Sequence, residues 1–188
     1  MRARRRVDAF RRTVSGPPGT RASDAPAPGR HAADPDSDIA LFLIGLRINR
    51  LRSLRGGLRV VTSMLRLLDD LHDDHDSGYR GHRILFGPTP REMTVLQYWA
   101  SREQLLAFAT DPGHRHRAAW REFERMVRSS AGGVGLWHEI YRVPRDGISS
   151  FYLDVPPLGL AAVTGLTPRG PGGRREPNWR AASHHALP

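Results

Sequence analysis

Four residues between positions 101 and 130 share the spacing of one helical face. They are His116, Trp120, Phe123 and Val127, which lie four, three and four positions apart. A histidine on this apolar side points toward whatever the helix covers rather than toward water. In a pocket, its imidazole could act as a general base or donate a hydrogen bond to a substrate oxygen. The alternative is a core histidine whose ring is satisfied by a backbone carbonyl.

A second histidine falls within an expected strand. His138 alternates with Leu136 and Ile140 and therefore points to the opposite side of the sheet from Trp137. If Trp137 faces outward, His138 faces the helices and the same cavity as His116. Two histidines in one pocket would suit proton transfer. A sheet histidine that bonds across strands is the alternative.

Other side chains could complete such a pocket. Tyr98, Trp99, Trp120 and Phe123 could bind a flat apolar substrate, although aromatic residues at these spacings also build plain core. Asn49 ends the first expected strand and could orient a substrate carbonyl or dioxygen. Capping of the strand end is its alternative role.

The charge of the chain resides mainly in its ends. The formal net charge is +10, but residues 1–37 hold eight Arg against four Asp, and residues 168–188 hold four Arg against one Glu. The middle of the chain is nearly balanced, and no basic stripe accompanies a recognition helix, so we expect no nucleic-acid partner. The absence of cysteine excludes disulfides and thiolate metal sites.

Several other classes of function lack their motifs. We find no glycine-rich phosphate loop, no GxSxG elbow and no HExxH pair. The acidic run 69–76, with His72 and His75, reads as a solvated turn, and we assign no metal site. The longest apolar run, 39–46, is far shorter than the roughly 20 residues that span a bilayer. We therefore expect a cytoplasmic protein without a membrane partner.

Hydropathy divides the chain into one domain and two tails. Residues 1–37 and 168–188 are rich in Arg, Pro and Gly and poor in large apolar side chains, which predicts disorder. Between them, residues 38–167 form the expected domain. The predicted strands are 38–48, 82–86, 92–99, 134–143 and 150–155. The predicted helices are 58–71 and a second helix that starts near Ser101, breaks at 111–113 and resumes to about 128.

This order predicts an α+β fold of the ferredoxin-like type, β-α-β-β-α-β, with an extra C-terminal strand. Two helices can cover only one face of such a sheet. The first strand is apolar on both sides, so its outer face, with Trp137 and Tyr141, needs another cover. A second copy packed sheet to sheet would make a homodimeric α/β barrel.

Five stretches of the domain resemble one known group of proteins. They are 42–50, 95–99, 116–120, 135–144 and 155–160. Among them are the runs Val95-Leu-Gln-Tyr-Trp99 and Gly135-Leu-Trp-His-Glu139. The domain is similar to the dimeric α/β-barrel proteins related to antibiotic-biosynthesis monooxygenases. Its closer resemblance is to a bacterial and fungal branch that includes the monooxygenase of the fumagillin pathway.

The resemblance implies a monooxygenase, an oxidoreductase of secondary metabolism, that acts on a small apolar metabolite. Its chemistry would be cofactor-independent or haem-assisted, because related barrels that bind haem carry the ligand histidine on the helix of His116. In the catalytic hypothesis His116 and His138 move protons, Asn49 holds the oxygen, and the aromatic residues shape the pocket. The alternative is a barrel that binds a small molecule or haem without turnover.

Overall fold

The computed structural model describes residues 25–111, 121, 124–125 and 127–169. Its largest unit is a four-stranded antiparallel sheet in the order β3-β4-β2-β5. The strands are β2 (Ile39–Ile48), β3 (Tyr79–Phe86), β4 (Glu92–Trp99) and β5 (Val134–Val143). The first strand of this unit lies at the centre of the sheet, between the third and the fourth. This order is that of a ferredoxin-like fold, which confirms the predicted fold class.

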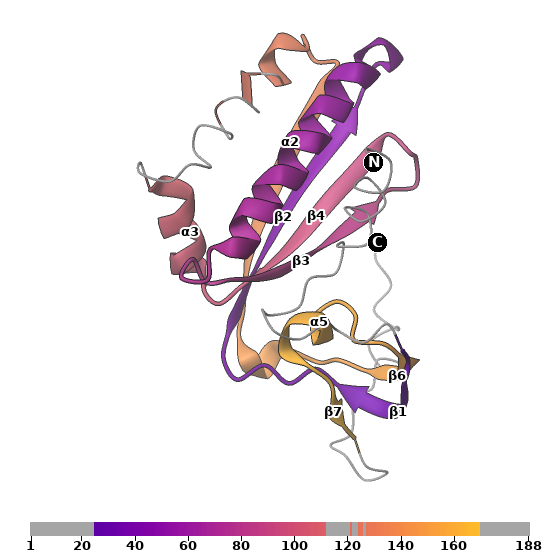
Figure 1. Ribbon diagram of the computed structural model, residues 1–188, viewed down its shortest axis with the longest axis vertical. Helices are drawn as coiled ribbons and strands as arrows, with labels where there is room; N and C mark the ends of the chain where they lie inside the picture. Colours follow the sequence, from indigo (N-terminus) through magenta and orange to yellow (C-terminus); the bar gives the residue numbers. More distant parts are fainter. Residues whose placement is uncertain (1–24, 112–120, 122–123, 126, 170–188) are drawn as a thin grey trace, which may run out of the picture.

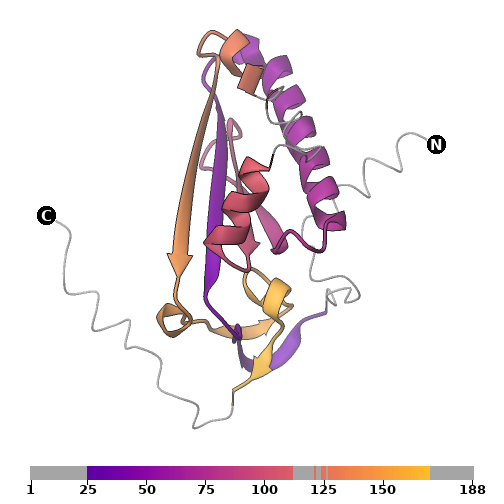
Figure 2. The same cartoon turned by 90° about the vertical axis from the view of Figure 1, so that its left-hand side faces the viewer.

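Helices α2 (Leu54–Asp73) and α3 (Arg102–Thr110) cover one face of this sheet (Figures 1 and 2). Helix α2 buries a stripe of residues at helical spacing, Val60, Met64, Leu68 and Leu71. Ser101 caps the start of α3, where the sequence predicted the helix to begin, and its side chain accepts a hydrogen bond from the Gln104 backbone N–H. After residues 112–120, which lie outside the described part, helical backbone is described at 127–129 and leads into β5.

The main core lies between this sheet face and α2. Nine buried apolar residues form it: Ile44, Leu46, Ile48, Val60, Met64, Leu68, Met93, Val95 and Val134. Gly57 lets the helix approach the sheet closely, because a Cβ there would lie 2.7 Å from Ile48 Cδ1. The side chains of β2 that point toward the helices therefore lie in a densely packed core. None of the described helices is long and apolar enough to cross a membrane.

A second, smaller sheet lies at one end of the molecule, below the large sheet in Figure 1. It contains β1 (Ala27–Ala32), β6 (Tyr152–Val155) and β7 (Thr167–Pro168), in the order β6-β1-β7. The predicted extra strand exists as β6, and it pairs with β1 and not with the four-stranded sheet.

The prediction that all of residues 1–37 lack structure is wrong for the part that forms β1. Backbone pairing holds this segment, and its few apolar side chains gave no signal. The Ser150 hydroxyl donates to the Ala33 carbonyl and accepts from the Ala33 N–H, at 2.9 and 2.8 Å. Residues 1–24 and 170–188 lie outside the described residues, so the predictions for them stay predictions.

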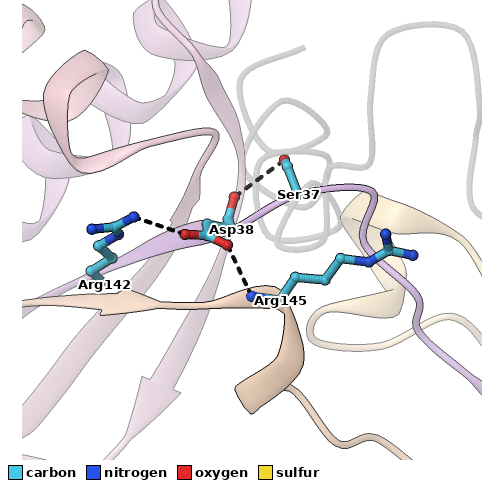
Figure 3. Close-up of polar contacts among 4 residues, drawn as sticks. All are labelled: Ser37, Asp38, Arg142 and Arg145. Atoms are coloured by element: carbon cyan, nitrogen blue, oxygen red, sulfur yellow. Dashed lines mark hydrogen bonds and ion pairs between the residues drawn. The ribbon is translucent and has the colours of Figure 1, made fainter.

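An ion pair joins the entry of β2 to the end of β5 (Figure 3). Asp38 accepts a hydrogen bond from the Arg145 backbone N–H and another from Arg142 Nη2, each at 3.0 Å. These two donors lower the pKa of Asp38 below its ordinary value. A short 3-10 turn, η2 (Arg145–Gly147), follows, and the chain then continues toward the small sheet.

The described residues cover the outer face of the large sheet only in part. The short helix α5 (Ala161–Thr164) and the segment before it pack on one end of this face. There Ile39, Tyr98 and Val163 are buried, with Leu41, Leu96 and Leu160 packed against them. On the edge strand β5, at the same face, Trp137 is 42% exposed and Tyr141 is 48% exposed. The apolar outer face that the sequence predicted is therefore present.

Candidate functional site

Polar side chains gather on the helix-facing side of the sheet, where the surroundings are mostly apolar. The strand register places His82, Gln97, Phe42 and Ile140 in one row across β3, β4, β2 and β5. Trp99 lies in the next row on the same face, opposite Tyr79 and Ala40. Trp99 was predicted from the sequence as a pocket residue, whereas Tyr79, His82 and Gln97 were not.

A hydrogen bond of 2.5 Å joins the Tyr79 hydroxyl to His82 Nδ1. Burial lowers the pKa of His82 to about 4, and the neighbouring His72 on α2 adds to this effect. Burial also raises the pKa of Tyr79, and so does the negative charge of Asp69. Both groups are therefore uncharged at neutral pH, and in the tautomer in which Tyr79 donates to Nδ1 the imidazole carries its own hydrogen on Nε2.

A bulge brings Tyr79 and His82 to the same side of β3. Residues three apart in a regular strand point to opposite faces. Here the register of β3 against β4 shifts between Tyr79 and Gly81, and Gly81 has a positive φ of 147°. The extra residue reverses the alternation, so both side chains face the helices. A glycine inside a strand pattern was the available signal for this bulge.

Gln97 is the buried polar residue of the row, with 6% of its surface exposed. Its Oε1 accepts a hydrogen bond of 3.0 Å from Trp99 Nε1, which fixes which side of the amide is the donor. No described residue accepts a hydrogen bond from the Gln97 Nε2. This amide is therefore an oriented donor that lies between Phe42 and His82 in the row.

Aromatic rings surround the indole of Trp99, which is 1% exposed. Its ring centroid lies 5.5 Å from that of Tyr79, in an edge-on geometry, and 5.3 Å from that of Phe108 on α3. The hydrogen bond to Gln97 and these rings hold Trp99 rigidly. Trp99 thus holds the Gln97 amide in place, and its ring forms part of the aromatic surface beside that amide.

His138 lies on the same sheet face, as the sequence predicted. It pairs with Ile44 across β2, and its ring centroid lies 6.0 Å from that of Phe42. Its side chain is exposed, whereas that of His82 is half-buried. Phe42 and Gln97 separate the two histidines, because one strand and then the next lie between β5 and β3.

The structure does not bring the other predicted residues to this group. Tyr98 follows directly on Gln97 along β4, so its side chain faces the outer side of the sheet, away from Trp99. Asn49 is exposed beyond the end of β2, where its Nδ2 donates to the Gly132 carbonyl at 3.0 Å. That bond corresponds to the strand-end alternative.

The remaining candidates cannot be placed. His116, Trp120 and Phe123 lie outside the described residues. An axial haem ligand at His116 therefore stays a prediction. Among the described residues, no group of three or more histidine or acidic side chains could hold a metal ion. The described site is thus a set of hydrogen-bond donors beside the aromatic rings of Trp99 and Phe42. Such a set can stabilise negative charge on a substrate oxygen.

The chain is a member of the Monooxygenase af470-like family, whose profile matches residues 39–160. This match confirms the resemblance to antibiotic-biosynthesis-monooxygenase-like proteins, whereas the narrower resemblance to the fumagillin-pathway enzyme is not confirmed. A comparison with curated proteins found no significant sequence match.

Several solved structures are similar in part. A conserved protein of unknown function from Bacteroides thetaiotaomicron is 13% identical with a TM-score of 0.40, over 57% of this chain and 99% of that chain. SnoaB, a cofactor-independent oxygenase from Streptomyces nogalater, is 10% identical with a TM-score of 0.38, over 55% and 90%. An aldoxime dehydratase, solved with butyraldoxime, is 12% identical with a TM-score of 0.46, over 77% and 41%. Likeness at this level carries no argument about activity.

Proposed function

We propose that this protein is a cofactor-independent monooxygenase that acts on a flat, mostly apolar ketone of about three fused rings with an acidic CH₂. Family membership supports oxygenase or oxidoreductase chemistry as the class of activity. The observation that carries the proposal is the oriented Gln97 amide, on the same sheet face as His138 and His82.

The spacing of these groups supports the substrate class. His138 on β5 and Gln97 on β4 are separated by β2 and by two residues along the strand direction, which together amount to about 12 Å. Phe42 lies between them on β2. A tricyclic aromatic ring system has a comparable length. It would stack over Phe42 with one edge near His138 and an oxygen near Gln97.

The reaction needs a base that removes a proton and a hydrogen-bond donor that stabilises the negative charge on the substrate oxygen. In the proposed reaction His138 takes a proton from an acidic CH₂ of the substrate. Gln97 Nε2 and His82 Nε2 donate hydrogen bonds to the enolate oxygen that forms. The carbanion then reduces dioxygen and forms a C–O bond as a hydroperoxide. Loss of water breaks the O–O bond and leaves a new carbonyl, so that CH₂ and O₂ become C=O and H₂O.

Oxygen uptake tests this proposal. Anthrone, a tricyclic ketone with an acidic CH₂, should be consumed with one O₂ per molecule at a rate above its autoxidation without protein. His138→Gln should lower kcat by about 10²- to 10⁴-fold, and Gln97→Leu by roughly 10²-fold. His75→Gln, an exposed histidine beyond α2, serves as the matched control and should retain full activity. Full turnover by both site variants would refute these roles. Saturable anthrone binding without uptake would instead identify a binding protein.

We also propose that the protein is a homodimer that packs its outer sheet face against a second copy. Support comes from Trp137 and Tyr141, two large apolar side chains exposed on the same face of β5. Light scattering should give twice the mass of one chain. Trp137→Asp should yield monomers, because it would place an unpaired charge in the interface. A wild-type monomer would contradict the proposal.

Other expectations remain predictions. They are the cytoplasmic location, a role in secondary metabolism, and the parts assigned to His116, Trp120 and Phe123.

A further inference from the structure

Large apolar side chains are exposed at the end of the molecule that lies away from the small sheet (Figure 1). Three of them are leucines in the 3-10 turn η1 (Leu51–Ser53) and the first turns of α2, and the fourth is Phe86, the last residue of β3. Their exposed fractions are 66% for Leu51, 48% for Leu54, 55% for Leu58 and 65% for Phe86. A single exposed leucine is ordinary, but a group of large apolar side chains at one end of a protein indicates an interaction surface.

The exposed leucines of α2 lie on the flank of the helix that faces β3. His72 lies 18 positions after Leu54, about five helical turns, and is therefore on the same flank. His72 is close enough to His82 on β3 for its charge to lower the pKa of that residue. Phe86 points to the same helix-facing side of β3, because it pairs with the core residue Met93. The leucines and Phe86 thus belong to one side of the molecule.

Exposed arginines surround these apolar side chains. Between Asp38 and Asp69 the sequence contains six arginines and no acidic residue. All six side chains are exposed: Arg47, Arg50, Arg52, Arg55, Arg59 and Arg66. Arg47 pairs with Glu92, and the other five form no ion pair with a described residue. This end of the molecule is therefore both apolar and positively charged.

An anionic lipid surface offers the two features that this combination requires. Its headgroups attract arginine, and the acyl chains just beneath them accommodate leucine and phenylalanine side chains. Nucleic acid would attract the arginines but would leave the leucines in water. The leucines cover about two helical turns, which is enough for insertion at the interface and far too short to span a bilayer.

We propose that this end of the molecule docks on anionic membrane surfaces, with Leu54, Leu58 and Phe86 inserted at the interface and Arg55 and Arg59 on the lipid phosphates. The expectation of no membrane partner rested on the lack of a spanning segment, which does not bear on a surface contact. The proposal is independent of the proposed reaction, whose residues it does not involve.

Flotation of the full chain with lipid vesicles tests the proposal. The protein should bind vesicles of phosphatidylcholine and phosphatidylglycerol at three to one, and should bind phosphatidylcholine alone about tenfold more weakly. Leu54→Gln combined with Leu58→Gln should weaken binding to the mixed vesicles about tenfold, because two inserted side chains are lost. Phe151→Gln combined with Leu153→Gln is the matched control. It removes two exposed apolar side chains at the small sheet and should leave binding unchanged.

Arginine variants test the contribution of charge separately. Arg55→Gln combined with Arg59→Gln should weaken binding about tenfold. Arg30→Gln combined with Arg169→Gln removes the same charge at the small sheet and should have no effect. All of these side chains are exposed, so the melting temperatures should stay close to that of the wild type.

Two results would overturn the proposal. The first is no binding of the wild type to the mixed vesicles in about 0.1 M NaCl, which would leave this surface to a protein partner. The second is unchanged binding in either the leucine or the arginine variant, since docking would then not use both kinds of side chain.

Discussion

The indole of Trp137 lies directly over Gly45, its partner in the β2–β5 register. A Cβ at position 45 would overlap the indole ring, so the flat packing of this exposed tryptophan depends on a glycine in the neighbouring strand. The central strand thus has a small residue on its outer face where β5 has its largest one. This relationship sets the shape of the face that we propose to be an interface.

Gly45→Ala should push the Trp137 ring off the sheet. We expect a loss of about 1–2 kcal/mol in the free energy of unfolding, because the added methyl group overpacks the contact. Tryptophan emission should shift to longer wavelength as the ring enters water. The same change in a Trp137→Phe background should produce no shift. An unshifted spectrum in the single variant would contradict the described contact.

Two adjacent glycines of α2 should respond to alanine in opposite directions. Gly57 faces the sheet, where a Cβ would crowd Ile48, so Gly57→Ala should cost about 1–2 kcal/mol. Gly56 has nothing within 4 Å of its Cβ position, so Gly56→Ala should add up to about 0.5–1 kcal/mol through helix propensity. Urea denaturation of both variants measures this difference. Equal effects would mean that α2 does not lie on β2 as described.

Stability should depend on pH through His82. The pKa of this residue falls from 6.5 in the unfolded chain to about 4 in the folded one. As pH decreases through this window, the unfolded state binds the proton first. Wild-type stability is therefore complete above about 6.5 and should decline by roughly 3 kcal/mol by pH 4. His82→Gln should lack this part of the decline in urea titrations between pH 4 and 7.5. Parallel curves for the two proteins would contradict the burial of His82.

Asp38 should stabilise the junction of β2 and β5 only while it is ionised. Its folded pKa lies below the ordinary value of 3.8, so this contribution is present above that pH and is lost as pH falls through the folded value. Asp38→Asn should lower the melting temperature modestly at pH 7, since surface pairs are weak. The difference from wild type should disappear in acid. Asp36→Asn, a nearby exposed aspartate, should have no effect at either pH.

The sequence predicted the parts of the fold that hydropathy encodes. Strand β2 is apolar on both sides and α2 has a clear helical stripe, so both were found, with ends that differ by a few residues. Strand β1 was missed because its sequence, Ala-Pro-Gly-Arg-His-Ala, carries no apolar alternation. It is held by backbone bonds to β6, and pairing between segments 125 residues apart leaves no local pattern.

The candidate site was predictable only in part. Alternation placed His138 on the helix-facing side correctly, because β5 is regular. The same rule would separate Tyr79 from His82, since it takes no account of the bulge before Gly81. It also separates Tyr98 from Trp99, although the sequence analysis had grouped these adjacent aromatic residues in one pocket. Composition suggested an aromatic pocket, but strand geometry decided which rings share a side.

The pairing of β1 with β7 has a mechanical consequence. Residues 30–32 lie antiparallel to 167–169, so both ends of the described chain leave along neighbouring strands. Tension applied between these ends would open the β1–β7 hydrogen bonds one after another and would not shear them together. The long registers of β2 with β4 and β5 would not carry the load until the small sheet had peeled away. Single-molecule pulling experiments should therefore find that the β1–β7 pairing of the small sheet breaks first, at a low force.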